Sequence, residues 1–147
     1  MSMETTARLG LPLLAPGQAQ KELFHNEALA LVDAATQAAV KGTADPVPAD
    51  AAVGDCWIVG AGAGGEWAGR RGAIACRTAG GWRFVAAREG MAAWDEGAGL
   101  TLRFQGGAWR TGPAVAEPAG GGTVDAEARA ALVRVLAALR SHGLIAG

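Results

Sequence analysis

The sequence predicts an α+β fold, in which a small antiparallel β-sandwich or barrel of about six short strands stands between an N-terminal and a C-terminal helix. Three observations support this prediction. All five tryptophans lie between Gly54 and Gly112, and within that stretch three Gly-Gly pairs run into a tryptophan. The short runs between the glycines alternate apolar and polar residues, which is the period of half-buried strands. Apolar stripes at helical spacing lie on both sides of this stretch.

Glycines, prolines and apolar stripes divide the 147 residues into segments. Gly10 and Pro12 interrupt the apolar run near the N-terminus, so we expect an extended arm there that lies on another surface, such as a neighbouring subunit. The first helix is expected to run to about Val40 and to end before the Pro46/Pro48 pair. The predicted segments are an extended arm (1–15), an N-terminal oligomerisation helix (16–41), a β-domain (54–112), a linker (113–122) and a C-terminal helix (123–147).

Both predicted helices carry apolar residues at the 4-3 spacing of a coiled-coil seam. An apolar helix beside a small β-domain needs a partner surface. That partner is either the other helix of the same chain or further copies of the chain, and we favour a symmetric oligomer. The expected interface residues are Phe24, Ala28, Leu31, Ala35, Leu132, Val135 and Leu139.

The ends of the last helix carry recognisable capping residues. Thr123 or Asp125 is expected to cap its N-terminus. Gly143 follows the last periodic residues and is expected to end the helix in a left-handed conformation. Leu144 then folds back onto Leu139, which is the hydrophobic contact of a Schellman motif.

The hairpin at Gly106-Gly107 can be worked out residue by residue. A two-residue turn places Arg103 directly opposite Arg110 and Phe104 opposite Trp109. Two arginines at opposed positions repel each other unless a negative group lies between them. One interpretation is a carboxylate of the chain as that group. The alternative is an anionic ligand such as a sugar acid, because the guanidinium fork matches a carboxylate. The candidate carboxylates are Glu66, Glu89 and Asp95.

The tryptophans raise the question of carbohydrate binding, since sugars stack on exposed flat rings. Those on or beside the predicted strands are expected to fill the core, whereas Trp67 and Trp94 stand beside loops and are the candidates for exposed rings. The predicted ligand-binding residues are therefore Trp67, Trp94, Arg103 and Arg110.

Composition and motifs argue against several other functions. The net charge is −1 and the sequence has no basic block, so it lacks the cluster of positive charge that nucleic-acid binding requires. No apolar run reaches the roughly 18 residues of a membrane span, and the N-terminus lacks the features of a secretory signal. Cys56 and Cys76 match no metal-binding spacing, and we expect both to be buried strand residues. A disulfide between them requires that their strands be neighbours.

No catalytic or metal-binding motif is evident. Consecutive helical residues point in directions about 100° apart, so His25-Asn26-Glu27 cannot converge on one ligand. We interpret these three residues as a polar patch that contacts backbone or another subunit. The remaining candidate carboxylates stand in no motif that a hydrolytic mechanism requires. We therefore predict a protein that is not an enzyme and has no cofactor or metal. The carboxylates considered are Asp55, Glu66, Glu89, Asp95 and Glu96.

Several strings in this sequence resemble a family of uncharacterised proteins found mainly in alphaproteobacterial prophages. Relatives of that family occur as tail-fibre components of gene transfer agents, which are phage-like particles that carry host DNA. The most specific match is the string that runs from Pro16 through Gln18-Ala19-Gln20-Lys21-Glu22 to His25-Asn26-Glu27-Ala28-Leu29. The similarity continues through Gly54-Asp55-Cys56-Trp57, Gly80-Gly81-Trp82 and Gly106-Gly107-Ala108-Trp109 to the C-terminal helix.

The resemblance implies a virion structural protein, namely a tail-fibre component that contributes to attachment to the host cell surface. It implies a homotrimer, since tail fibres are usually trimeric, with other tail or baseplate proteins as partners and a cell-surface glycan as a further partner. It places the protein in the tail of the particle after synthesis in the bacterial cytoplasm without a signal peptide. The alternative function is a stand-alone carbohydrate-binding module.

Overall fold

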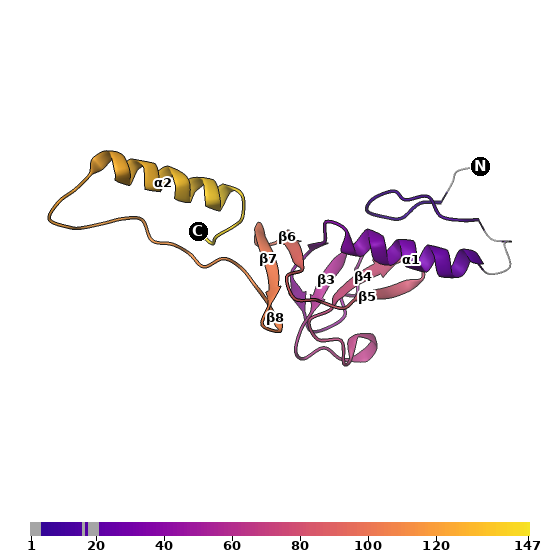
Figure 1. The fold of residues 1–147 in the computed structure, drawn as a ribbon. Coiled ribbons are helices and arrows are strands. Elements are labelled where there is room, and N and C mark those ends of the chain that lie inside the picture. The colour runs from indigo at the N-terminus through magenta and orange to yellow at the C-terminus, as the bar shows by residue number, and fades with distance from the viewer. Residues whose placement is uncertain (1–3, 16, 18–20) are drawn as a thin grey trace.

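The computed structural model describes residues 4–15, 17 and 21–147. It confirms the α+β class, with an N-terminal helix, two four-stranded mixed sheets and a C-terminal helix (Figure 1). The elements are α1 (Lys21–Ala35), β1 (Ala39–Val40), β2 (Thr43–Ala44), β3 (Cys56–Val59), the 3-10 turn η1 (Gly65–Trp67), β4 (Ile74–Thr78), β5 (Gly81–Val85), β6 (Ala92–Asp95), β7 (Leu100–Gln105), β8 (Ala108–Arg110) and α2 (Ala126–Ser141).

The two sheets have the strand orders β1-β6-β7-β8 and β2-β3-β4-β5. All six predicted strands are present, and the Gly106-Gly107 hairpin has the predicted register, with Arg103 opposite Arg110. The short strands β1 and β2 were not predicted. Each joins its sheet in parallel, β1 beside β6 and β2 beside β3, so both sheets are mixed where purely antiparallel pairing was expected.

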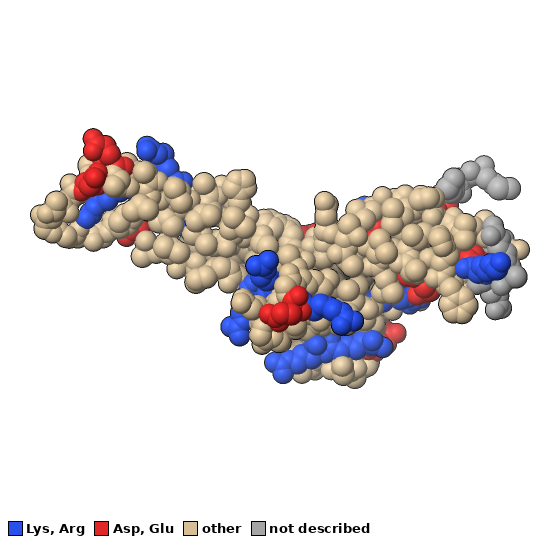
Figure 2. Space-filling view, viewed as in Figure 1, with Lys and Arg blue, Asp and Glu red and all other residues tan. Residues whose placement is uncertain are grey.

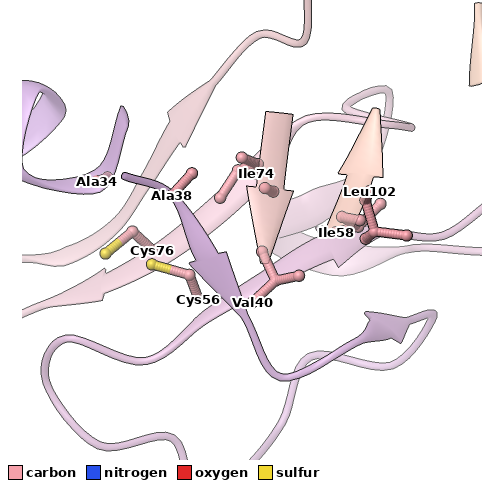
Figure 3. Close-up of a cluster of buried hydrophobic side chains, with 9 residues drawn as sticks. Ala34, Ala38, Val40, Cys56, Ile58, Ile74, Cys76 and Leu102 are labelled. Atoms are coloured by element: carbon pink, nitrogen blue, oxygen red, sulfur yellow. The ribbon is translucent and has the colours of Figure 1, made fainter. Parts of the chain in front are cut away.

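The sheets share one hydrophobic core (Figure 3). Val40 of β1, Ile74 of β4 and Leu102 of β7 are buried there with the end of α1. Burial of such side chains contributes roughly 1.5–3 kcal/mol each. A second cluster covers the other face of the β2-β3-β4-β5 sheet, where Trp67 from η1 packs edge-on against Trp82 with ring centroids 5.0 Å apart.

Cys56 and Cys76 are directly opposite each other on β3 and β4, so their strands are neighbours. Both side chains are buried and both are free thiols (Figure 3). The prediction that they are small buried strand residues is confirmed.

Helix α1 ends at Ala35, whereas the sequence predicted a helix to about Val40. The prediction was wrong because burial of Ala38 and Val40 in the shared core outweighs helix propensity. Gln37 takes a left-handed backbone conformation with φ 47°, which turns the chain from α1 into β1. The guanidinium group of Arg8 donates to the carbonyl oxygens of Asp33, Ala34 and Gln37, and so caps the end of α1. Pro16 and residues 18–20 of the predicted helix opening lie outside the described residues.

The N-terminal arm, described here as residues 4–15, lies on α1 of its own chain. Thr5 and Pro12 form an isolated antiparallel bridge, which makes the arm a small loop. The buried carboxylate of Asp33 accepts hydrogen bonds from the Thr6 hydroxyl at 2.8 Å and from the backbone N–H of Arg8 at 3.0 Å. The segment is therefore looped where an extended arm was expected, and it lies on the helix of its own chain, whereas the surface suggested from the sequence was a neighbouring subunit.

The last residues, 113–147, form what we call the C-terminal stalk, in which α2 lies apart from both sheets beside the segment that leads to it (Figure 1). The side chain of Asp125 caps α2 by accepting from the N–H of Ala128 at 2.8 Å. Gly143 and Leu144 donate backbone hydrogen bonds to Arg140 and Leu139, which is the predicted Schellman pattern. No helix in the described part of the chain is long and apolar enough to cross a membrane.

Candidate functional site

Arg103 and Arg110 project from the outward face of the β1-β6-β7-β8 sheet. Side chains alternate between the faces of a strand, so the register places Ala92, Trp94 and Thr101 on the same face. The opposite face carries Ala93 and Leu102, which are buried in the shared core. Three of the four predicted ligand-binding residues, Trp94, Arg103 and Arg110, therefore share one face of one sheet.

A groove of about 480 Å³ runs over this face, and we call it the arginine groove. Its floor combines the two guanidinium groups with hydroxyl and amide groups, and the residues after β8 and near the C-terminus form its apolar sides. The lining residues are Ala92, Thr101, Arg103, Gln105, Arg110, Thr111, Gly112, Pro113 and Leu144.

The C-terminal residues hold one side of the arginine groove in place. The N–H of Thr101 donates to the carbonyl oxygen of Gly143 at 2.7 Å, and the N–H of Ala146 donates to that of Gly112 at 3.1 Å. The residues around Gly143 therefore lie beside the beginning of β7, which the short strand β8 does not reach. A methyl group on Gly112 would overlap the carbonyl oxygen of Leu144, so glycine is required for this close approach.

The two tryptophans predicted to be exposed differ in their environments. Trp94 is 41% exposed, and its ring lies against Gly143. Trp67 has no exposed surface, because the 3-10 turn η1 carries it into the second core cluster. The prediction that Trp67 stacks on a sugar is therefore wrong, since a ligand cannot reach a buried ring.

The residues predicted to form an oligomer interface lie largely on open surface. Phe24 of α1 is 77% exposed, and Leu132 and Val135 of α2 are 52% and 54% exposed. Ala28, Leu31 and Ala35 are also exposed, whereas Leu139 is half-buried. In one view of the surface, the charged side chains of the C-terminal stalk lie towards its outer end, and the part nearer the sheets is largely uncharged (Figure 2).

One side of α2 is already occupied by the segment that precedes it. Arg140 donates to the carbonyl oxygen of Val115 at 2.8 Å and pairs with Glu117, and Arg129 donates to the carbonyl oxygen of Gly120. Leu136 lies on the same side of the helix and is buried. The seam that contains Leu132 and Val135 flanks this side and remains uncovered.

Two residues of the His25-Asn26-Glu27 patch, Asn26 and Glu27, make separate contacts within the chain. Asn26 exchanges two hydrogen bonds with the backbone of Leu14, at 2.9 and 3.0 Å. Glu27 forms a bidentate ion pair with Arg83 of β5. This hydrogen-bonded pairing lowers the pKa of the Glu27 carboxyl and raises the pKa of Arg83.

A cavity of about 200 Å³ lies between the N-terminal arm, α1 and the β4–β5 hairpin. Cys76 is among its lining residues. Close contact with the Cys56 thiol lowers the pKa of the Cys76 thiol, and the same contact, together with burial, raises the pKa of Cys56. Across residues 4–15, 17 and 21–147, no three His, Cys, Asp or Glu side chains gather closely enough to hold a metal ion.

The arginine pair could be recognised from the sequence, whereas the other side of the groove could not. Strand alternation places Thr101 and Gln105 on the same face as Arg103, and this signal is local. Leu144 and Pro113 reach the groove only because the C-terminal residues return to the sheet after α2. No local pattern encodes that return.

Comparison with known proteins identifies one family. The family model described as "Protein of unknown function (DUF2793)" matches residues 25–110, which is more than half of the chain. The matched segment begins within α1 and ends at the last residue of β8, so it contains both sheets. No curated protein matches the chain.

Proposed function

The chain belongs to the DUF2793 family of proteins of unknown function, and we propose that it is a self-associating structural component of a phage-like particle. In this proposal it is a non-enzymatic part of the tail fibre, forms a homotrimer and contributes to attachment to the host cell surface. Its partners are further copies of the chain and other tail or baseplate proteins. The resemblance to prophage and gene-transfer-agent proteins supports the setting and the number of subunits.

The main observation that supports self-association is the uncovered apolar seam of α2. Leu132 and Val135 are each more than half exposed, although the segment before α2 covers the neighbouring side of the same helix. Exposed apolar surface of this kind usually marks an interface. A second copy is the favoured occupant, because the 4-3 spacing of the seam is that of helices packing on their own copies. The exposed stripe of α1, with Phe24 at its start, adds a second such surface.

Leu132→Asp tests this proposal. Leu132 is 52% exposed in the single chain, so the substitution leaves the fold of the monomer intact. In an assembled seam it buries an unpaired charge, which costs about 3–5 kcal/mol and weakens association by roughly 100-fold or more. Arg134→Asp is the matched control, because residue 134 lies on the far side of α2 from Leu132. Gel filtration with light scattering should show dissociation for Leu132→Asp only. An assembled mass for that variant would contradict the proposal.

A stand-alone carbohydrate-binding module is the alternative function. Its supporting observation is the alignment of Trp94, Arg103 and Arg110 on one open sheet face. The two proposals differ in assembly, because a stand-alone module requires no second copy and its exposed helices would remain free.

A further inference from the structure

The two arginines of the arginine groove have no carboxylate partner among the residues that the structure describes. The ion pairs among the described residues all involve other side chains. They join Lys41 to Asp55 and Glu96, Arg83 to Glu27, and Arg140 to Glu117. The side chain of Arg110 instead donates to the backbone carbonyl of Gln105 at 3.3 Å.

The carboxylates that might have neutralised this pair have other roles. Glu89 accepts hydrogen bonds from the N–H of Gly106 at 3.1 and 3.2 Å. Asp95 accepts from the N–H groups of Gly97 and Ala98, both at 3.0 Å. Glu66 belongs to η1, which packs on the other sheet. Two like charges at directly opposed strand positions destabilise a sheet, so the fold tolerates a repulsion that an external anion would relieve.

The surroundings of the pair are suited to a ligand that is acidic and rich in hydroxyl groups. The hydroxyls of Thr101 and Thr111 and the amide of Gln105 offer neutral hydrogen-bonding groups, and Leu144 and Pro113 offer apolar walls. Trp94 stands opposite Thr101 in the sheet register, on the same face and partly exposed. An aromatic ring beside such polar groups favours the apolar face of a sugar.

We propose that the arginine groove binds an acidic saccharide, with a carboxylate of the sugar between the guanidinium groups of Arg103 and Arg110. The inference names the chemical class of receptor for the attachment role and rests on that proposed function for its biological setting. Each guanidinium presents a planar fork of N–H donors that matches a carboxylate. Among the described residues that line the groove, two are cations, which suits single acidic groups along a sugar chain better than a densely charged polyphosphate.

Titration calorimetry of the full chain with trigalacturonate tests the proposal. Arg103→Gln and Arg110→Gln should each weaken binding by about tenfold or more, because each removes a charge-assisted contact. Arg134→Gln, which removes an exposed arginine of α2 outside the groove, should bind like the unaltered protein. The thermal midpoints of the two groove variants should equal or exceed that of the unaltered protein, since the repulsion is relieved. This last readout separates lost binding from misfolding.

Two other ligands test whether the arginine groove prefers an acidic saccharide to a neutral saccharide and to a small anion. Maltotriose, a neutral trisaccharide, should not bind, and inorganic phosphate should bind more weakly than trigalacturonate. The proposal is overturned if trigalacturonate fails to bind at millimolar concentration, if both groove variants bind it normally, or if phosphate or maltotriose binds equally well. The solution mass of the same samples reports self-association separately, so failure of the groove and failure of the fibre proposal are distinguishable.

Discussion

The ring of Trp94 lies against Gly143, so that a methyl group on that glycine would stand 2.6 Å from the ring. This contact joins β6 to the turn that follows α2, and the hydrogen bond from Thr101 to Gly143 lies beside it. These contacts hold the C-terminal stalk against the sheet next to the arginine groove.

Gly143→Ala should release this fastening. Gly143 has φ 63°, a left-handed conformation that costs a non-glycine residue about 1–2 kcal/mol, and the added methyl also overlaps Trp94. We expect faster hydrogen exchange in α2 and faster proteolysis within residues 113–122, with little change in the sheets. Gly122→Ala is the control, since its added methyl meets open space. Equal protection of α2 in both variants would show that Gly143 does not anchor the stalk.

Trp67 should behave as a core residue. It is fully buried against Trp82, and no acceptor among the described residues reaches its indole N–H. Trp67→Ala should lower the free energy of unfolding by about 3–5 kcal/mol. Trp67→Phe should cost less, because it keeps a ring and removes the unpaired donor. Urea unfolding followed by circular dichroism measures the free energy of unfolding of both variants. Trp94→Ala is the reference, because Trp94 is partly exposed and its loss should have a small effect. A similar small effect at Trp67 would contradict its burial.

The Glu27–Arg83 pair should make stability depend on pH in the acid range. The pairing lowers the pKa of Glu27 in the folded state, so its contribution is complete above the unfolded value of about 4.3 and is lost as the pH falls through the folded pKa. Glu27→Gln should therefore lose up to about 1 kcal/mol at pH 7, since both side chains are partly exposed, and progressively less below pH ~4.

Urea unfolding at a series of pH values from neutral to acid measures this difference. Glu66→Gln is the control, because Glu66 is exposed and belongs to none of the ion pairs found among the described residues. A Glu27→Gln deficit that stays constant down to pH ~3 would show that the ion pair does not carry it.

Cys76 should be the more acidic thiol of the buried pair. The neighbouring Cys56 thiol is the main cause of its lowered pKa, so Cys56→Ala should raise the pH at which iodoacetamide alkylates Cys76. Mass spectrometry of peptides from alkylated native protein measures the midpoint, and urea-unfolded protein provides the reference in which the two thiols react alike. An unchanged or lower midpoint in Cys56→Ala would contradict the assignment.

The parts of the fold that depend on local geometry could be predicted from the sequence. The two-residue turn at Gly106-Gly107 fixes the register that places Arg103 opposite Arg110. Asp125 and Gly143 mark the ends of α2 because capping requires those residue types at those positions. The apolar stripe of α2 that contains Leu132 and Val135 followed from its periodicity, whereas its exposure in the single chain is a finding of the structure.

The parts that depend on distant contacts could not be predicted. Val40 continues an apolar helical pattern, yet it forms β1 because β6, far along the chain, offers it a buried parallel edge. Trp67 stands in a glycine-rich loop that suggested exposure, but η1 folds over the β2-β3-β4-β5 sheet and buries it. Leu144 completes the arginine groove only through the return of the chain after α2. Each outcome depends on which surfaces the finished fold brings together.

The measurement that tests the central proposal most directly is the solution mass of the intact chain, by light scattering during gel filtration over a range of protein concentrations. The single chain has a mass of 14.8 kDa. We predict a particle of three times that mass, held together by the seams of α1 and α2. A mass of one chain at every concentration would contradict self-association and would favour the stand-alone carbohydrate-binding module.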